Sequence, residues 1–153
     1  MPDALAILVV CTANICRSPA AQAVFQHRLL GHPCEIGSTG TQAASGQPMD
    51  AAMQGLLRQR GLDPMTTHRS TPFTLGALRN SQLILTMEHH HLQQVLQIDP
   101  TLRAKTKLLG HWDRTEILDP HGGTPAQYAQ ALTLIERAVD AWVGKLGSLG
   151  LMA

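Results

Sequence analysis

A cysteine and an arginine separated by five residues, Cys11 and Arg17, are the pair in this chain whose types and spacing most suggest chemistry. Cys11 follows an apolar run at residues 4–10, and Ser18-Pro19 comes directly after Arg17, at the start of a helical pattern. A strand, a short loop and a helix N-terminus in this order can direct several backbone N–H groups at one anion. The same positive end, together with Arg17, favours the thiolate form of Cys11. The spacing therefore predicts a nucleophilic cysteine at the bottom of a phosphate-binding loop.

Both residues also have a simpler interpretation. Cys11 could be a buried structural cysteine, and Arg17 could be a surface side chain near a helix start. A cation at a helix N-terminus is unfavourable, however, so a bound anion explains Arg17 better. The loop between the two residues is expected to contribute mainly backbone N–H groups, from Thr12, Ala13, Asn14, Ile15 and Cys16. Asn14 also tolerates a positive φ better than most residues do.

The elements that must position this loop alternate along the chain. Strands are predicted at four apolar segments, residues 4–10, 34–38, 82–87 and 107–109. Helical patterns lie between and after them, at residues 18–30, 48–61, 74–78, 88–97 and from residue 124 onward. This alternation predicts an α/β protein, with a mostly parallel four-stranded sheet between two layers of helices. Ligands of such folds bind at the carboxyl ends of the strands, where Cys11 is expected. We expect residues 1–153 to form one domain, with a frayed tail at residues 147–153.

Composition narrows the class of protein further. Of the 153 residues, 44% are hydrophobic, which favours a globular protein over a disordered one. The formal net charge is only +1 and no run of Lys or Arg occurs, so nucleic acid is not an expected partner. The apolar segment at residues 4–10 is too short to span a membrane and lacks the basic flank of a signal peptide. Three cysteines are too few for a secreted disulfide framework, so a cytoplasmic location is expected.

Four further segments outside the loop are informative, because their residue types and order match those of a known protein family. They are Ser38-Thr39-Gly40-Thr41, Gln47-Pro48-Met49-Asp50, His68-Arg69 and Ile117-Leu118-Asp119-Pro120. In this order, the segments resemble the low-molecular-weight protein tyrosine phosphatase family over residues 4–146. The resemblance implies a Rossmann-like phosphatase fold that hydrolyses phosphotyrosine through a phosphocysteine intermediate, without a metal or organic cofactor. It further implies a phosphotyrosine protein substrate, such as a bacterial tyrosine kinase of exopolysaccharide synthesis, and we expect a monomer or weak dimer.

The resemblance also implies roles for individual residues. Asp119 is the expected general acid, which would protonate the leaving oxygen and later activate water. An Asp-Pro dipeptide alone usually marks a turn, as we expect for Asp63-Pro64, so it is the position before the last helix that singles out Asp119. Ser18 is expected to cap the first helix and also to hydrogen-bond the Cys11 sulfur. Ser38 and His68 are expected to support the loop by contacting Asn14.

Cys16 and the run His89-His90-His91 have two interpretations each. Cys16 could capture a sulfenic acid formed on Cys11, or it could simply fill space in the loop, and the sequence does not decide between the two. Three consecutive histidines suggest a metal ion, but neighbouring residues of a helix point in different directions. No metal site is therefore predicted, and the histidines are expected to be solvated at a helix start.

The chain departs from the family where the substrate ring would bind. The usual aromatic residues after Asp-Pro are replaced by His121-Gly122-Gly123, and none lies in Gln42-Ala43-Ala44-Ser45. We therefore expect weaker or altered recognition of the ring, with His121 stacking in place of the missing aromatic residue. A kcat/KM for a phosphotyrosine peptide equal to that of typical members would contradict this expectation.

Two other activities fit the same loop less well. An arsenate reductase of the relay type needs further cysteines downstream, and no cysteine follows Cys34. A module that only binds phosphorylated proteins would need neither Cys11 nor Asp119. A purely structural α/β protein would leave the Cys-x5-Arg-Ser loop unexplained.

Overall fold

The structure of the protein is a computed structural model, which describes residues 5–150. The sheet consists of β1 (Leu5–Cys11), β2 (Cys34–Gly40), β3 (Leu83–Thr86) and β4 (Thr106–Leu108). These strands lie in the order β2-β1-β3-β4, and every neighbouring pair is parallel. The helices are α1 (Arg17–Arg28), α2 (Ala51–Gln59), α3 (Leu75–Asn80), α4 (His89–Ile98) and α5 (Pro125–Ser148), with short 3₁₀ helices η1 (Pro100–Lys105) and η2 (His111–Asp113).

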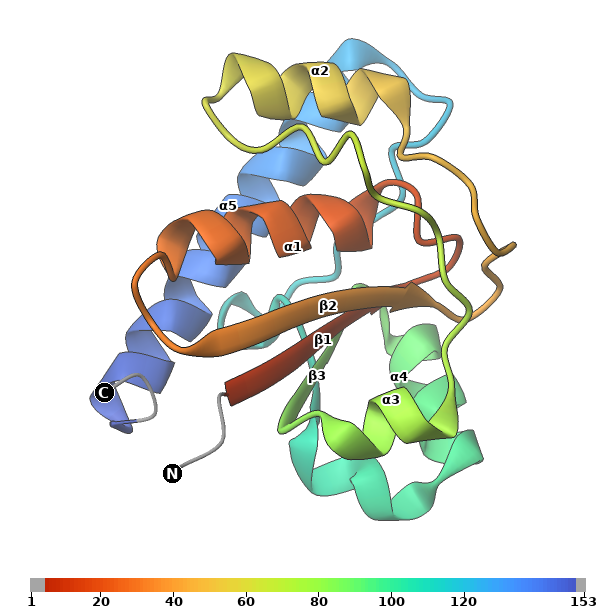
Figure 1. Ribbon diagram of the computed structural model, residues 1–153, viewed down its shortest axis with the longest axis vertical. Coiled ribbons are helices and arrows are strands. Elements are labelled where there is room, and N and C mark those ends of the chain that lie inside the picture. The colour runs from red at the N-terminus through yellow and green to blue at the C-terminus, as the bar shows by residue number, and fades with distance from the viewer. Residues whose placement is uncertain (1–4, 151–153) are drawn as a thin grey trace.

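Helices cover both faces of this sheet, which confirms the predicted three-layer α/β fold. Helices α1, α2 and α5 lie on one face, and α3 and α4 lie on the other (Figure 1). The central strand β1 serves both layers because successive side chains of a strand point to opposite faces. Ile7 and Val9 belong to the apolar cluster under α1 and α5, whereas Leu8 and Val10 belong to the cluster under α3 and α4. An apolar run without alternation is the expected result of burial on both faces.

The strand order places Cys11 at the point where the chain changes direction across the sheet. From β1, the chain crosses through α1 to β2 on one side, and it later returns to β3 on the other side of β1. The loops after β1 and β3 therefore diverge at the carboxyl edge of the sheet, which leaves a crevice there. Cys11 is the last residue of β1, so it lies at this crevice.

The predicted elements differ from the observed ones in the positions of several ends and in the two 3₁₀ helices, which the sequence did not predict. Helix α1 begins at Arg17 with Cys16 as its N-cap residue, so the prediction that Ser18 caps this helix is wrong. One of these 3₁₀ helices, η2, lies between the predicted strand at residues 107–109 and the predicted helix from residue 124, and its Trp112 packs edge-on against Trp142 with ring centroids 5.2 Å apart. Helix α5 continues through Ser148, and the expected fraying of residues 147–153 stays a prediction, since residues 151–153 lie outside the described residues.

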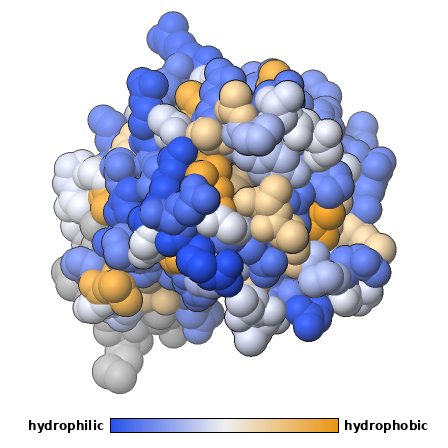
Figure 2. All heavy atoms as spheres, turned by 90° about the horizontal axis from the view of Figure 1, so that it is seen from above, coloured by the Kyte–Doolittle hydropathy of each residue, from blue (hydrophilic) through white to orange (hydrophobic). Residues whose placement is uncertain are grey.

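The surface mixes apolar and polar side chains. On the face seen from above, hydrophobic residues lie in small groups separated by hydrophilic ones (Figure 2). Within residues 5–150, no helix is both long and apolar enough to cross a membrane.

Gly40, the last residue of β2, is required by the close approach of the loop that follows Cys11. A Cβ atom at this position would lie 2.5 Å from the Thr12 carbonyl oxygen and 3.0 Å from the Asn14 nitrogen, and neither backbone atom can rotate away. We expect Gly40→Ala to lower the free energy of unfolding by about 1–3 kcal/mol, measured by urea denaturation.

Gly55→Ala in α2 is the matched control, because a Cβ atom there meets nothing within 4 Å. This substitution in a helix interior should raise the free energy of unfolding by roughly 0.5–1 kcal/mol. Equal effects of the two substitutions would contradict the proposed close approach at Gly40.

Candidate active site

The loop of residues 12–16 leaves the end of β1 and is held by backbone hydrogen bonds from neighbouring segments. The carbonyl oxygens of Cys11 and Thr12 accept from the N–H groups of Thr41 and Gln42, both at 2.9 Å. At the far end of the loop, the Ile15 carbonyl accepts from the Asp50 N–H at 2.7 Å. The loop carbonyls thus point outward to these partners, which leaves the inner side of the loop to N–H groups.

Asn14 is the residue on which the loop turns. Its φ is 60°, in the left-handed region that Asn tolerates. The buried side chain donates from Nδ2 to the hydroxyl oxygens of Ser18 at 2.8 Å and Ser38 at 3.0 Å, and Oδ1 accepts from the Thr71 N–H at 2.8 Å. His68 Nε2 donates to the Asn14 carbonyl at 2.7 Å. The structure therefore brings both Ser38 and His68 to Asn14.

Ser18 lies in the first turn of α1 with its hydroxyl directed at Cys11. The Ser18 oxygen is 3.0 Å from Cys11 Sγ and accepts from Asn14 Nδ2. Because Asn14 supplies a hydrogen to this oxygen, the Ser18 hydroxyl hydrogen is left for its two acceptors, the Cys11 sulfur and the Thr39 carbonyl at the longer distance of 3.5 Å. A hydrogen bond to the sulfur stabilises a thiolate. The N-cap residue Cys16 makes no side-chain cap hydrogen bond, so the first N–H groups of α1 are left for an anion.

The Arg17 guanidinium is buried, with only 2% of the side chain exposed. Its Nη1 donates to Glu88 Oε2 and to the Ile117 carbonyl, both at 2.7 Å. Partial burial alone would raise the pKa of Glu88, but the hydrogen bond and charge of Arg17 hold that pKa below its usual value. Glu88 thus remains ionised and compensates the buried cation. We missed Glu88 in the sequence, although its place directly after β3 puts it at the same sheet edge as Cys11.

Asp119 lies at the rim of the site. Its Oδ1 is 3.9 Å from Arg17 Nε, and 47% of its side chain is exposed. A pocket at this edge brings the predicted nucleophile, arginine and carboxylate together; its lining residues are Cys11, Ala13, Asn14, Ile15, Cys16, Arg17, Asp119 and His121. Among the predicted loop residues, Thr12 does not line this pocket, because its hydroxyl is turned toward His91 at 2.8 Å.

A buried carboxylate, Asp50, anchors the segment that follows Asp119. Asp50 caps α2 by accepting from the Met53 N–H at 3.0 Å, and it also accepts from the Tyr128 hydroxyl at 2.7 Å and from His121 Nδ1. Burial would raise the pKa of Asp50, but these hydrogen bonds hold the pKa below its usual value. The Tyr128 oxygen accepts in turn from the Gly122 N–H at 3.2 Å. Sequence reasoning missed this network, in which only the capping position of Asp50 was recognisable.

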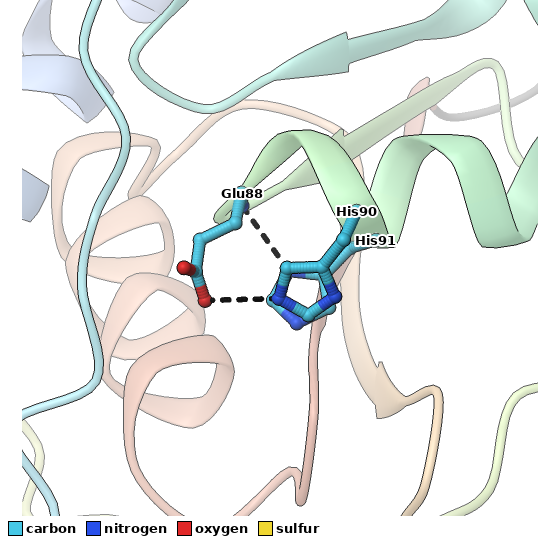
Figure 3. A group of neighbouring side chains, drawn as sticks. All are labelled: Glu88, His90 and His91. Atoms are coloured by element: carbon cyan, nitrogen blue, oxygen red, sulfur yellow. Dashed lines mark hydrogen bonds and ion pairs between the residues drawn. The ribbon is translucent and has the colours of Figure 1, made fainter.

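Glu88, His90 and His91 are the group whose atoms come closest to a metal site. One ligand atom from each lies within 4.8 Å of the other two (Figure 3). His89 does not belong to this group. The candidate ligand atoms of these residues already take part in hydrogen bonds within the protein. Glu88 Oε2 accepts from Arg17 and lies 3.2 Å from His90 Nε2, and both ring nitrogens of His91 have hydrogen-bond partners. The expectation that this histidine run is solvated is wrong for His91, which is 0% exposed.

Cys16 lies on the pocket wall beside Cys11. Burial, followed by the charges of Asp50 and Asp119, raises the pKa of the Cys16 thiol. Cys16 is therefore held as a neutral thiol at neutral pH.

This arrangement defines a class, namely an α/β protein with a cysteine-based anion-binding loop at its sheet edge. The sequence profile of the low molecular weight phosphotyrosine protein phosphatases matches residues 6–149. A putative low molecular weight protein-tyrosine-phosphatase of Klebsiella pneumoniae is 36% identical, over 92% of this chain and 96% of that protein. The chain belongs to the low-molecular-weight protein tyrosine phosphatase family, and it is a phosphatase.

Two solved structures of phosphatases are similar to the structure of this chain. The tyrosine phosphatase Wzb of Escherichia coli K30, in complex with sulphate, superimposes with a TM-score of 0.86 at 38% identity, over 92% of this chain and 97% of that one. The YwlE arginine phosphatase of Geobacillus stearothermophilus superimposes with a TM-score of 0.88 at 29% identity, over 96% of each chain. The same fold therefore carries phosphatases named for two different phosphorylated residues.

The buried histidine makes stability depend on pH. Burial, with the charges of His90 and Arg17, lowers the pKa of His91 from 6.5 to about 4. Between these values, the unfolded chain binds a proton that the folded chain does not, so stability must fall as the pH is lowered. We expect the free energy of unfolding to fall between pH 6.5 and about 4, with this histidine contributing a slope of at most about 1.4 kcal/mol per pH unit.

Urea denaturation at several pH values measures this contribution as the difference between the wild type and His91→Asn. The variant removes the histidine but leaves the carboxylates that also titrate at acid pH. Parallel curves for the two proteins would show that His91 has an ordinary pKa.

Proposed function

We propose that the chain hydrolyses phosphomonoesters with Cys11 as nucleophile, Arg17 as phosphate clamp and Asp119 as general acid and base. The observation that supports this proposal is that one pocket at the sheet edge is lined by all three side chains. The N–H groups of residues 12–16 and of the first turn of α1 complete the set of donors for the phosphoryl oxygens. Ser38 and His68 would act indirectly, by holding Asn14 and hence the shape of the loop.

The reaction has two displacement steps. In the first step, the Cys11 thiolate attacks phosphorus in line, the ester P–O bond breaks, and Asp119 gives its proton to the leaving oxygen. In the second step, water attacks phosphorus and the S–P bond breaks, while Asp119 takes the proton from the water. Arg17 and the loop N–H groups stabilise the charge on the equatorial oxygens in both steps. These groups supply the positive charge that other phosphatases take from metal ions.

Phosphotyrosine in proteins is the proposed substrate class. The pocket walls beside Cys11 carry the aliphatic side chains of Ala13 and Ile15, and His121 stands at the rim. Apolar walls and one ring suit an aromatic ester better than a charged leaving group. By resemblance to the family, a bacterial tyrosine kinase of exopolysaccharide synthesis is the proposed partner. The proposal includes a single domain at residues 1–153, a cytoplasmic location and a monomer or weak dimer.

Hydrolysis of p-nitrophenyl phosphate against pH tests the catalytic roles. We expect Cys11→Ser to be inactive, and Asp119→Ala to lose kcat by a factor on the order of 10²–10⁴. The loss for Asp119→Ala should be larger for an alkyl phosphate, because a more basic leaving oxygen needs the proton more. Asp63→Ala is the matched control, since Asp63 also precedes a proline but makes a local turn contact with the Met65 N–H at 2.9 Å.

Two results would contradict these assignments. Absence of turnover by folded, reduced wild-type protein would withdraw the hydrolase mechanism and favour a phosphate-binding module. Equal losses in Asp119→Ala and Asp63→Ala would withdraw Asp119 as the general acid.

His121→Ala tests recognition of the substrate ring. Loss of one stacking contact should lower kcat/KM for a phosphotyrosine peptide by roughly threefold to tenfold. An alkyl phosphate, which has no ring to stack, measures the separate effect of releasing His121 from Asp50. Equal losses on both substrates would show that His121 acts only through Asp50. Preference for a phosphoarginine peptide over the phosphotyrosine peptide would place the chain with the arginine phosphatases in specificity.

A further inference from the structure

We propose that His91 is a positioning residue for phosphate binding: it connects Thr12 of the loop to the backbone of Glu88, and so fixes both neighbours of the Arg17 guanidinium. The inference rests on the proposed function of the loop. It begins with the position of His91 in the first turn of α4, where the side chain is fully buried between the helix start and the loop (Figure 3).

The hydrogen bonds of His91 define its tautomer. The Glu88 N–H can only donate, so His91 Nδ1 accepts from it at 3.1 Å. In a neutral imidazole the other nitrogen then carries the hydrogen, so Nε2 donates to the Thr12 hydroxyl oxygen at 2.8 Å. Both nitrogens are used, each for a different segment of the chain. The ring therefore acts as a rigid link of fixed length between α4 and the loop.

Both residues that His91 joins also accept a hydrogen bond from Arg17. Glu88, at one end, accepts from Arg17 Nη1 at 2.7 Å through its side chain. Thr12, at the other end, accepts a long hydrogen bond of 3.5 Å from Arg17 Nη2. Arg17, Glu88, His91 and Thr12 thus form a closed ring of hydrogen bonds around the guanidinium. Since each terminal nitrogen of Arg17 has its own partner in this ring, the plane of the fork is fixed before an anion binds.

The exposed neighbour His90 covers the His91 ring and separates it from solvent. The two ring centroids are 4.0 Å apart, with planes tilted by 48°. His89 is also exposed and stays outside the Glu88-His90-His91 group. Of the three consecutive histidines, therefore, one is a buried link, one covers it, and one offers a matched control for substitution.

Two substitutions of His91 distinguish its hydrogen bond with the Glu88 N–H from its hydrogen bond with the Thr12 hydroxyl. In His91→Asn the side-chain oxygen reaches about as far as Nδ1, so it can still accept from the Glu88 N–H, but Thr12 is out of reach. In His91→Gln the longer side chain reaches about as far as Nε2 and can donate to Thr12. We expect His91→Asn to lower kcat/KM for p-nitrophenyl phosphate about tenfold, the loss of one buried hydrogen bond, and to weaken the Kd of inorganic phosphate similarly.

The expected result for His91→Gln is recovery to within about threefold of the wild-type kcat/KM, because the contact with Thr12 returns. His89→Asn should leave kcat/KM, the phosphate Kd and Tm unchanged. Combining His91→Asn with Thr12→Val should reduce kcat/KM no further than the more impaired single variant, because both substitutions remove the same hydrogen bond.

Three outcomes would overturn the proposal. A lower Tm for His91→Asn with unchanged kcat/KM and phosphate Kd would make His91 a structural residue only. Equal impairment of His91→Asn and His91→Gln would exclude the contact with Thr12 as the cause. Multiplied losses in the double variant would show that His91 and Thr12 act independently. An inactive wild-type protein would instead contradict the proposed function, so the two failures are distinguishable.

Discussion

A guanidinium buried at the edge of the sheet is the constraint on which the rest of this site depends. Arg17 can stay charged there because Glu88 and the Ile117 carbonyl accept its hydrogen bonds. These partners come from the segments after β3 and before α5, so one buried charge draws three distant parts of the chain together. The crevice created by the order β2-β1-β3-β4 supplies the space in which this can occur.

The loop itself is shaped by a network centred on a neutral amide. Asn14 combines a backbone φ of 60° with side-chain hydrogen bonds to residues on both sides of the loop. Its hydrogen bonds to Ser18 and Ser38 connect the loop to α1 and β2, which limits the conformations that the loop can adopt. Gly40 completes this arrangement by letting β2 end against the Thr12 carbonyl. A loop organised in advance loses little further entropy when phosphate binds.

Much of this could be predicted from local signals, and the remainder depends on contacts between distant segments. The apolar run at residues 4–10 and the Cys-x5-Arg spacing indicated the sheet and the loop, because both are patterns within a few residues. The capping role of Ser18 was wrongly predicted, since its hydroxyl is used across the loop by Cys11 and Asn14. Asp50 and His91 were missed or misjudged because each is defined by partners 71 to 79 positions away, which no local pattern encodes.

The different surroundings of the two loop cysteines have a consequence for chemical labelling. Burial and nearby carboxylates keep Cys16 protonated, whereas a serine hydroxyl and the helix N-terminus face the sulfur of Cys11. A small anionic alkylating reagent such as iodoacetate would enter the loop as an anion and meet a single reactive sulfur there. Carboxymethylation of Cys11 alone in the loop would then accompany complete inactivation, and excess inorganic phosphate would protect the protein from it.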